Sequence, residues 1–200
     1  MNYLIIFIHI FILYLIGSFP TAYIVGKLVK NIDIRNYGSG NVGATNVFRT
    51  LGKKYGIFVL IIDILKGFLP LLFIKNFSSF SKNDYFLILC GCALVAGHIW
   101  TIFLSFKGGK GVATATGVFL ALVPYAVLIC FFIFVLVVFL THYISAGSII
   151  AAFLLPFFVL IFYSEKKIFL LLAILISVFV IYKHKSNIIR IIKKEEHKFF

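Results

Sequence analysis

The stretch VATATGVFLALVPYAVLICFFIFVLVVFL, residues 112–140, has no charged side chain and is longer than one membrane span requires. A spanning helix needs about 20 apolar residues, because the hydrocarbon layer is about 30 Å thick and each helical residue rises about 1.5 Å. Pro124 lies inside the stretch, where a proline is compatible with a turn. The stretch therefore predicts either a hairpin of two short spans that turns near Pro124 or a run that is partly re-entrant.

The composition of the whole chain agrees with a membrane protein. Of its 200 residues, 62% are hydrophobic and only 12% are charged, and the mean hydropathy is +1.13. Soluble domains are about half apolar and about a quarter charged. The chain is therefore predicted to be an integral membrane protein.

Five more apolar runs are candidates for spans. They cover residues 3–25, 56–74, 85–106, 144–163 and 168–182. The first run lacks the basic segment that precedes the apolar part of a cleaved signal peptide, so we expect it to be retained. These runs leave no room for a soluble domain, and we expect one transmembrane domain over residues 1–200.

The basic residues predict how the spans are oriented, because Lys and Arg accumulate in cytoplasmic loops. Most of the 19 basic residues lie in segments 27–54, 107–110 and 183–200. The lysines of loop 164–167 are offset by an acidic residue, which indicates an outside loop. An odd number of crossings must separate 107–110 from 164–167. A hairpin within 112–140 supplies two crossings, and the run 144–163 supplies the third. We therefore expect an all-α protein of seven transmembrane helices, with the N-terminus outside and the C-terminus in the cytoplasm; five spans keep this parity only if one run is re-entrant.

The segment GSGNVGATN, residues 38–46, contains the pattern G-x-G-x-x-G. A dinucleotide fingerprint needs a soluble βαβ unit with an acid about 20 residues later, but Asp63 lies in an apolar run. Closely spaced glycines can still turn backbone N–H groups toward an anion. If a helix begins near Gly43, the Arg49 guanidinium lies on one helix face with the side chains of Thr45 and Asn46. We predict a phosphate site made by Ser39, Asn41, Thr45, Asn46 and Arg49; the alternative is an ordinary polar loop.

A second glycine-rich segment, FKGGKGVATATG, covers residues 106–117. It is not a Walker A motif, because Gly111 follows Lys110 where Ser or Thr is required. A basic turn before an apolar helix suits phosphate binding at the helix N-terminus. We predict phosphate contacts from Lys107, Gly108, Gly109, Lys110 and Gly111; the alternative is that the lysines only follow the positive-inside bias.

Ionisable side chains within apolar runs are candidates for function, because they are expensive in a membrane. His98 lies near the end of the run 85–106. Asp63 and Lys66 are three residues apart on one helix face, and pairing is the cheapest explanation for both charges. We expect this pair to be structural rather than catalytic.

The segment YKHKSNIIR, residues 182–190, places His184, Asn187 and Arg190 at three-residue steps on one helix face. Together with the two glycine-rich segments it lies on the predicted cytoplasmic side. The three patches could therefore form one site rich in phosphate donors.

Other ligands are less compatible with the sequence. All three cysteines fall in apolar runs, so no disulfide or metal site is expected. The net charge of +13 comes from residues that flank spans, without a soluble module to present them. Anionic lipid headgroups and small anions are therefore better partners than nucleic acid.

The segments GSGNVGATNVFRTLGKKYG, DILKGFLP, GH…FKGGKGVAT and H-x-x-N-I-x-R together resemble the PlsY family of membrane acyltransferases, over nearly the whole chain. The resemblance implies a seven-span enzyme of the bacterial inner membrane whose active site faces the cytoplasm. It implies acyl transfer from acyl phosphate to the sn-1 hydroxyl of glycerol-3-phosphate, which gives lysophosphatidate without a cofactor or a required protein partner.

The resemblance also implies roles for residues. Ser39, Arg49 and Lys107 would hold phosphate groups, and Asn41, Thr45, Asn46 and Lys110 would shape the two loops. His184, Asn187 and Ser145 would lie near the substrates as catalytic candidates, with His98. The chain departs from the family at Thr101, where a proline is usual, and at Lys185, where an arginine is usual.

An acyl phosphate carries a good leaving group, so the hydroxyl needs orientation rather than a nucleophile on the enzyme. We expect a substrate phosphate to take the proton; if a side chain does so, His184 and His98 are the candidates. The rival class is a carrier for small phosphorylated anions, but the sequence has no internal repeat of the kind that carriers often show.

Overall fold

The computed structural model describes residues 3–78, 80 and 82–199, and the regular elements within those ranges are all helical. Two compact units are found, Met1–Ala121 and Leu122–Phe200. The first unit contains α1 (Tyr3–Ser18), α2 (Thr21–Lys30), η1 (Ile34–Asn36), α3 (Ala44–Leu51), α4 (Lys53–Phe77), α5 (Asp84–Ile99), η2 (Ile102–Leu104) and most of α6 (Val112–Leu122). The second contains α7 (Pro124–Thr141), α8 (Ile144–Phe162), α9 (Lys167–Lys183) and α10 (Lys185–Ile192).

Among the described residues, 5 stretches are helical, long and apolar enough to cross a membrane. They are Tyr3–Lys30, Lys53–Phe77, Asp84–Leu104, Pro124–Thr141 and Ile144–Phe162. A further candidate is the pair Lys167–Lys183 and Lys185–Ile192, which is bent by 55°. These observations confirm the all-α membrane fold, with five to six candidate spans by length and composition.

The long apolar stretch of residues 112–140 is interrupted as its proline suggested. Helix α6 ends at Leu122, and α7 begins at Pro124 after Val123 adopts a non-helical conformation, φ −138 and ψ 61. The helical region is sterically disfavoured for the residue before a proline, which favours the break at Val123. Helix α6 has only 11 residues, about 16 Å of helix, which is shorter than a normal span.

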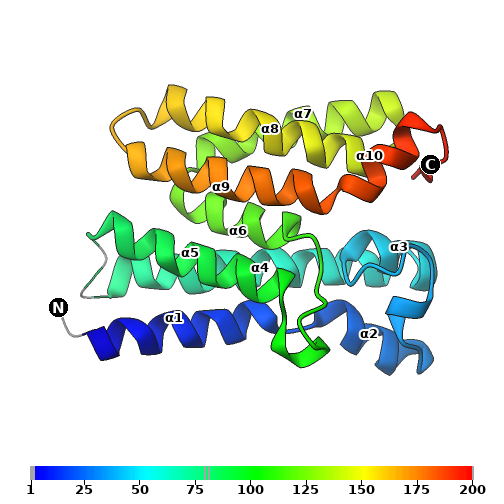
Figure 1. The fold of residues 1–200 in the computed structure, drawn as a ribbon, viewed down its shortest axis with the longest axis horizontal. Helices are drawn as coiled ribbons and strands as arrows, with labels where there is room; N and C mark the ends of the chain where they lie inside the picture. Colours follow the sequence, from blue (N-terminus) through cyan, green and yellow to red (C-terminus); the bar gives the residue numbers. More distant parts are fainter. Residues whose placement is uncertain (1–2, 79, 81, 200) are drawn as a thin grey trace. The chain divides into compact units, whose positions relative to one another are not determined.

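In the first unit, α1 lies beside α5 along its length, and α4 packs against both (Figure 1). Glycines permit the close approaches. A Cβ atom at Gly17 of α1 would overlap the Leu94 carbonyl of α5, and one at Gly67 of α4 would overlap the Thr114 carbonyl of α6. Small residues at crossings are typical of membrane helices, because they allow backbones to meet.

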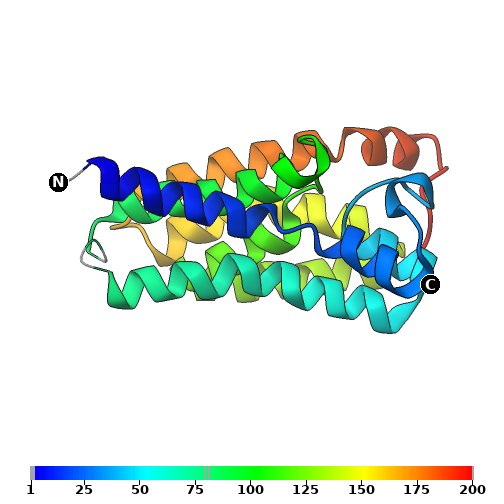
Figure 2. The ribbon, with the colours of Figure 1, turned by 90° about the horizontal axis from the view of Figure 1, so that it is seen from below.

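The apolar run expected over residues 3–25 is divided between two helices. Helix α1 ends at Ser18 and α2 begins at Thr21, with Phe19 and Pro20 between them. Proline has no N–H for the helical ladder and its ring clashes with the preceding turn, so the helix stops there. Figure 2 shows the two helices as separate segments of the chain.

The loop between α2 and α3 is anchored by its own apolar core. Val25 of α2, Ile34 of η1, Val42 of the loop and Val47 of α3 are buried together. Val59 of α4 completes this cluster. The loop that carries the first glycine-rich segment therefore packs, through Val42, against apolar side chains of α2, η1, α3 and α4.

In the second unit, α8 packs against both α7 and α9. Helix α10 lies against the ends of α8 and α9, at the red end of the chain in Figure 1. The C-terminal tail returns to the α7–α8 connection, where the Phe199 N–H donates to the His142 carbonyl at 2.8 Å.

Candidate functional site

The first glycine-rich loop is shaped by one buried side chain. Asn46 of α3 is 1% exposed; its Oδ1 accepts from the Ser39 N–H at 2.8 Å, and its Nδ2 donates to the carbonyls of Ile34 and Tyr37 at 3.1 and 3.0 Å. Gly38 takes φ +58, a left-handed conformation, and a Cβ there would overlap Asn46 Oδ1. The amide of Asn46 therefore holds the loop against α3.

Helix α3 begins at Ala44 with Gly43 as its N-cap, which is the start that the hypothesis of a shared polar face required. Thr45 lies on its first turn and Arg49 on its last, and both side chains are half-buried. Ser39 is exposed and Asn41 is half-buried in the loop before the helix. The structure thus places the phosphate donors predicted for this segment on one loop and the short helix that follows it.

The other arginine of this region is already paired. Asp33 caps η1 by accepting from the Arg35 N–H at 3.0 Å, and its carboxylate receives the Arg35 side chain with Nη2 to Oδ2 at 2.7 Å. The hydrogen bonds from Arg35 lower the pKa of Asp33 to about 2. Arg35 therefore forms an ion pair with Asp33. The arginine that the sequence predicts to bind phosphate is Arg49.

The second glycine-rich loop is bound back onto the end of α5. The N–H of Gly108 donates to the Ile99 carbonyl at 3.1 Å, and the N–H of Gly109 donates to the His98 carbonyl at 3.0 Å. A Cβ at Gly109 would overlap His98 Nε2 and approach the Val42 carbonyl. Only glycine fits there, and its N–H holds the loop in place. Lys107 is exposed and Lys110 half-buried on either side, and Gly111 takes φ +86.

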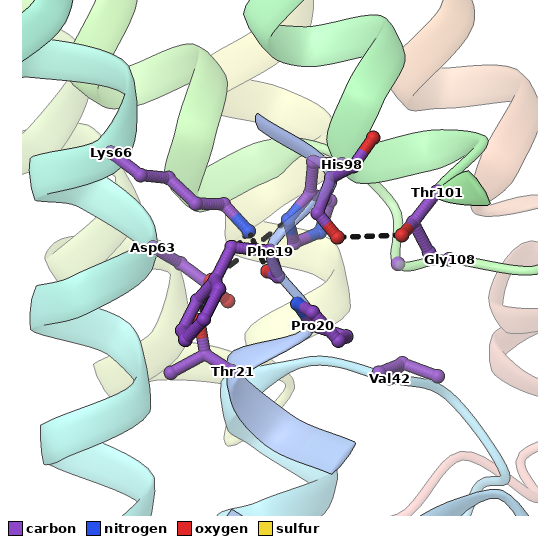
Figure 3. Close-up of a pocket in the computed structure, with 11 residues that line it drawn as sticks. Phe19, Pro20, Thr21, Val42, Asp63, Lys66, His98, Thr101 and Gly108 are labelled. Carbon is purple, nitrogen blue, oxygen red and sulfur yellow. Dashed lines mark hydrogen bonds and ion pairs between the residues drawn. The ribbon is translucent and has the colours of Figure 1, made fainter. Parts of the chain in front are cut away.

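Asp63 and Lys66, the charged pair of the second apolar run, form a buried cluster near Gly108 of this loop (Figure 3). Lys66 Nζ lies 2.8 Å from Asp63 Oδ1 and donates to the Phe19 carbonyl at 3.0 Å. Thr21 Oγ1 donates to the same Asp63 oxygen at 2.9 Å, and His98 Nδ1 is 4.0 Å from it. The predicted pair is thus formed, and it also caps the break between α1 and α2.

A small pocket lies at this cluster, where the two glycine-rich loops approach each other. Val42 of the first loop, Gly109 of the second loop and His98 of α5 all line this pocket. The remaining lining residues are Ser18, Phe19, Pro20, Thr21, Asp63, Lys66, Thr101 and Gly108. The structure therefore brings His98 and the Asp63–Lys66 pair to the point where the two predicted phosphate loops meet.

The second unit gathers three of the residues that the sequence singled out around one acid. Glu196 is 6% exposed; its Oε1 accepts from Ser145 Oγ at 2.9 Å and from Asn187 Nδ2 at 2.8 Å, and its Oε2 accepts from Arg190 Nε at 2.8 Å. Burial raises the pKa of Glu196, but the hydrogen bonds from Arg190, Asn187 and Ser145 lower it by more, so that the pKa of Glu196 lies below the usual range of a glutamate. Sequence reasoning missed Glu196, whose only signal is the Glu195–Glu196 pair within a basic tail.

His184 lies at the junction between α9 and α10 and is 3% exposed. Its Nδ1 is 2.7 Å from the Val180 carbonyl. A carbonyl oxygen can only accept, so Nδ1 carries the proton and Nε2 is the basic nitrogen. The expectation that this patch joins the two glycine-rich loops in one site stays a prediction.

Comparison with known proteins gives a consistent family. A family model described as glycerol-3-phosphate acyltransferase matches residues 7–194. A relative from Fusobacterium nucleatum called glycerol-3-phosphate acyltransferase is 47% identical over 96% of this chain and 97% of its own. One from Bacillus anthracis, glycerol-3-phosphate acyltransferase 2, is 48% identical over 92% of this chain and 94% of its own.

Two solved structures share the fold. Both are crystal structures of PlsY, described as an integral membrane glycerol 3-phosphate acyltransferase. The glycerol 3-phosphate form has a TM-score of 0.91 at 40% identity and covers 98% of this chain and 96% of its own. The lysophosphatidic acid form has a TM-score of 0.88 at 39% identity and covers 98% and 95%.

Proposed function

The chain belongs to the glycerol-3-phosphate acyltransferase family, and on that premise we propose that it transfers an acyl group from acyl phosphate to the sn-1 hydroxyl of glycerol-3-phosphate. The observation that carries the proposal is the meeting of two glycine-rich loops at one pocket, through Val42 and Gly109. Helix α3, which follows the first loop, carries Arg49, and the second loop carries Lys107; the sequence predicts that both cations bind phosphate. Two anionic substrates need two such sources of positive charge.

The reaction balances without a covalent enzyme intermediate. The sn-1 oxygen attacks the carbonyl carbon of the acyl phosphate and forms the new ester bond. The bond from that carbon to the phosphate oxygen breaks, and inorganic phosphate leaves with the electron pair. The hydroxyl proton passes to a phosphate oxygen, so the products are lysophosphatidate and inorganic phosphate.

The protein's contribution is to hold and orient the two anions. Arg49 offers a planar fork that suits two phosphate oxygens, and Lys107 offers a point charge. Their charge offsets the repulsion between the substrates, and orientation makes the attack effectively unimolecular. Ser145, His184 and Asn187 are proposed to contact the reacting groups, as the resemblance implies, and Ser39, Asn41, Thr45 and Lys110 to complete the phosphate contacts.

The membrane arrangement is part of the proposal. We propose that α1, α4, α5, α6, α7, α8 and α9 provide seven crossings, with α6 the short one. The basic segments then place the C-terminus and both loops in the cytoplasm and the N-terminus outside. The proposed location is the bacterial inner membrane, with no cofactor or protein partner required for activity.

The test is reconstitution of the purified full-length protein in lipid vesicles with labelled glycerol-3-phosphate. Acyl phosphate, acyl-CoA and acylated carrier protein are offered separately as donors. Lysophosphatidate should form from acyl phosphate, and Arg49→Ala and Lys107→Ala should each lower kcat/KM by about 100-fold or more. Lys54→Ala, an exposed cation at the start of α4, is the matched control and should retain activity. Failure to use acyl phosphate, or full activity in both loop variants, would contradict the proposal.

A further inference from the structure

The break between α1 and α2 creates backbone groups that the helices themselves do not satisfy. Pro20 interrupts the ladder, and the carbonyls of Ser18 and Phe19 lie beside it; the Thr21 N–H donates to the Phe19 carbonyl at 3.1 Å. Such groups are costly unless side chains satisfy them. Thr101 Oγ1 donates to the Ser18 carbonyl at 2.5 Å, and Lys66 Nζ donates to the Phe19 carbonyl at 3.0 Å.

Thr101 also organises the turn that leads into the second glycine-rich loop. Its carbonyl accepts from the Leu104 N–H at 3.2 Å and from the Phe106 N–H at 2.9 Å. Its hydroxyl caps η2 by accepting from the Phe103 N–H at 3.3 Å. Thr101 is 2% exposed, so one buried residue connects the broken helix to the start of the loop.

The loop itself rests on the residues just before Thr101. Gly108 and Gly109 donate to the carbonyls of Ile99 and His98, and neither glycine has space for a Cβ. A displacement at the end of α5 must therefore displace the loop with it. The Asp63–Lys66 pair fixes the other side of the contact, because Asp63 accepts from Thr21 at the start of α2.

We propose that Thr101 is a positioning residue, which clamps the end of α5 to the α1–α2 break and thereby sets the geometry of the loop that carries Lys107. This inference rests on the proposed function for its kinetic consequence. The hydroxyl is essential to this contact, because it donates to the Ser18 carbonyl and accepts from the Phe103 N–H.

The test compares three variants of the full-length protein in vesicles. Thr101→Val keeps the side-chain shape and removes the hydroxyl. We expect the KM for glycerol-3-phosphate to rise about tenfold while kcat changes less than about twofold, since a loosened loop weakens ground-state binding of phosphate. Thr101→Ser restores the hydroxyl and should restore the KM.

Thr114→Val is the matched control. Thr114 is also buried in the first unit, and its hydroxyl has no hydrogen-bond partner among the described residues. The same substitution there should leave the KM and kcat near their wild-type values. An increase in KM equal to that of Thr101→Val would show a general packing effect and overturn the proposal.

A second measurement does not depend on the reaction. Hydrogen–deuterium exchange of the peptides that contain Gly108 and Gly109 should be at least about tenfold faster in Thr101→Val than in the wild type, because their N–H bonds to α5 open more often. Unchanged exchange would overturn the clamp. A wild-type protein that makes no lysophosphatidate would instead contradict the proposed function, and the exchange result would still decide the clamp. If Thr101→Val does not fold, Thr101→Ala removes the same hydroxyl, and the same change in exchange is required.

Discussion

Asp63 and Lys66 face each other across one turn of α4, with Nζ to Oδ1 at 2.8 Å and both side chains at least nine-tenths buried. Neither charge would be tolerated alone at this depth. The pair also engages Thr21 and the Phe19 carbonyl on the neighbouring broken helix, so its partners extend beyond α4.

The first prediction concerns the loss of one member of this pair. Lys66→Met leaves the Asp63 carboxylate buried without its cation, and we expect a loss of about 3–5 kcal/mol in the free energy of unfolding. Adding Asp63→Asn should recover much of that loss, because the uncompensated charge is gone. Equilibrium unfolding in mixed detergent micelles measures both.

Lys75→Met is the control on the same helix. Lys75 donates to the Ala121 carbonyl at 2.8 Å and has no carboxylate partner among the ion pairs of the described residues. We expect a loss of about 1 kcal/mol there. Equal losses for the two lysines would contradict the importance of the Asp63 charge.

The second prediction concerns the first loop. Asn46→Asp replaces the Nδ2 donor with an oxygen that faces the carbonyls of Ile34 and Tyr37. Two hydrogen bonds become repulsive contacts, and we expect kcat/KM to fall by about 100-fold or more. Asn36→Asp adds the same charge at an exposed position of the loop and should change kcat/KM by less than about threefold.

The third prediction is a pH dependence of stability. Because the pKa of Glu196 is lowered in the folded protein, the stabilisation is complete above the ordinary pKa of a glutamate and is lost as the pH falls through the folded-state pKa. Wild type should therefore exceed Glu196→Gln in Tm at neutral pH, and the difference should shrink on acidification below about pH 4.5.

Glu195→Gln makes the same change at the neighbouring exposed residue. Its Tm should follow that of the wild type across the same pH range. A difference between wild type and Glu196→Gln that stays constant with pH would show that the three hydrogen bonds do not depend on the charge of Glu196.

The fourth prediction separates a side-chain base from a substrate phosphate. His184→Ala should lower the rate, but any change of log kcat between about pH 5 and pH 8 should remain, because the phosphate takes the proton. The measurement is a pH–rate profile of both proteins at saturating substrates. A pH dependence that disappears in His184→Ala while substrate binding is retained would assign the proton to His184.

The features that could be predicted from the sequence are those set by local physics. Apolar length and composition located the helices, Pro124 indicated the break at Val123, and Gly43 marked the start of α3. The Asp63–Lys66 pair followed from spacing and from the cost of a lone charge. Pro20 favours a break after α1, but the apolar run over residues 3–25 predicted one continuous span.

The remaining features depend on contacts between distant segments. Nothing local distinguishes Glu195, which is exposed, from Glu196, which is buried against Ser145 and Asn187. The spacing of Gly108 and Gly109 suggested backbone groups for an anion, yet their N–H groups donate to α5. Only the packed chain shows which donors hold the loop and which remain for a ligand.

The central claim is that acyl phosphate acylates the sn-1 oxygen of glycerol-3-phosphate, and an oxygen label follows that oxygen into the product. Glycerol-3-phosphate carrying ¹⁸O in its C1 hydroxyl is incubated with acyl phosphate and the reconstituted protein, and the products are examined by mass spectrometry. The account predicts 1-acyl lysophosphatidate with ¹⁸O in the bridging oxygen of the ester and inorganic phosphate without the label. Acylation at the second carbon, or an sn-1 ester that has lost the label, would contradict it.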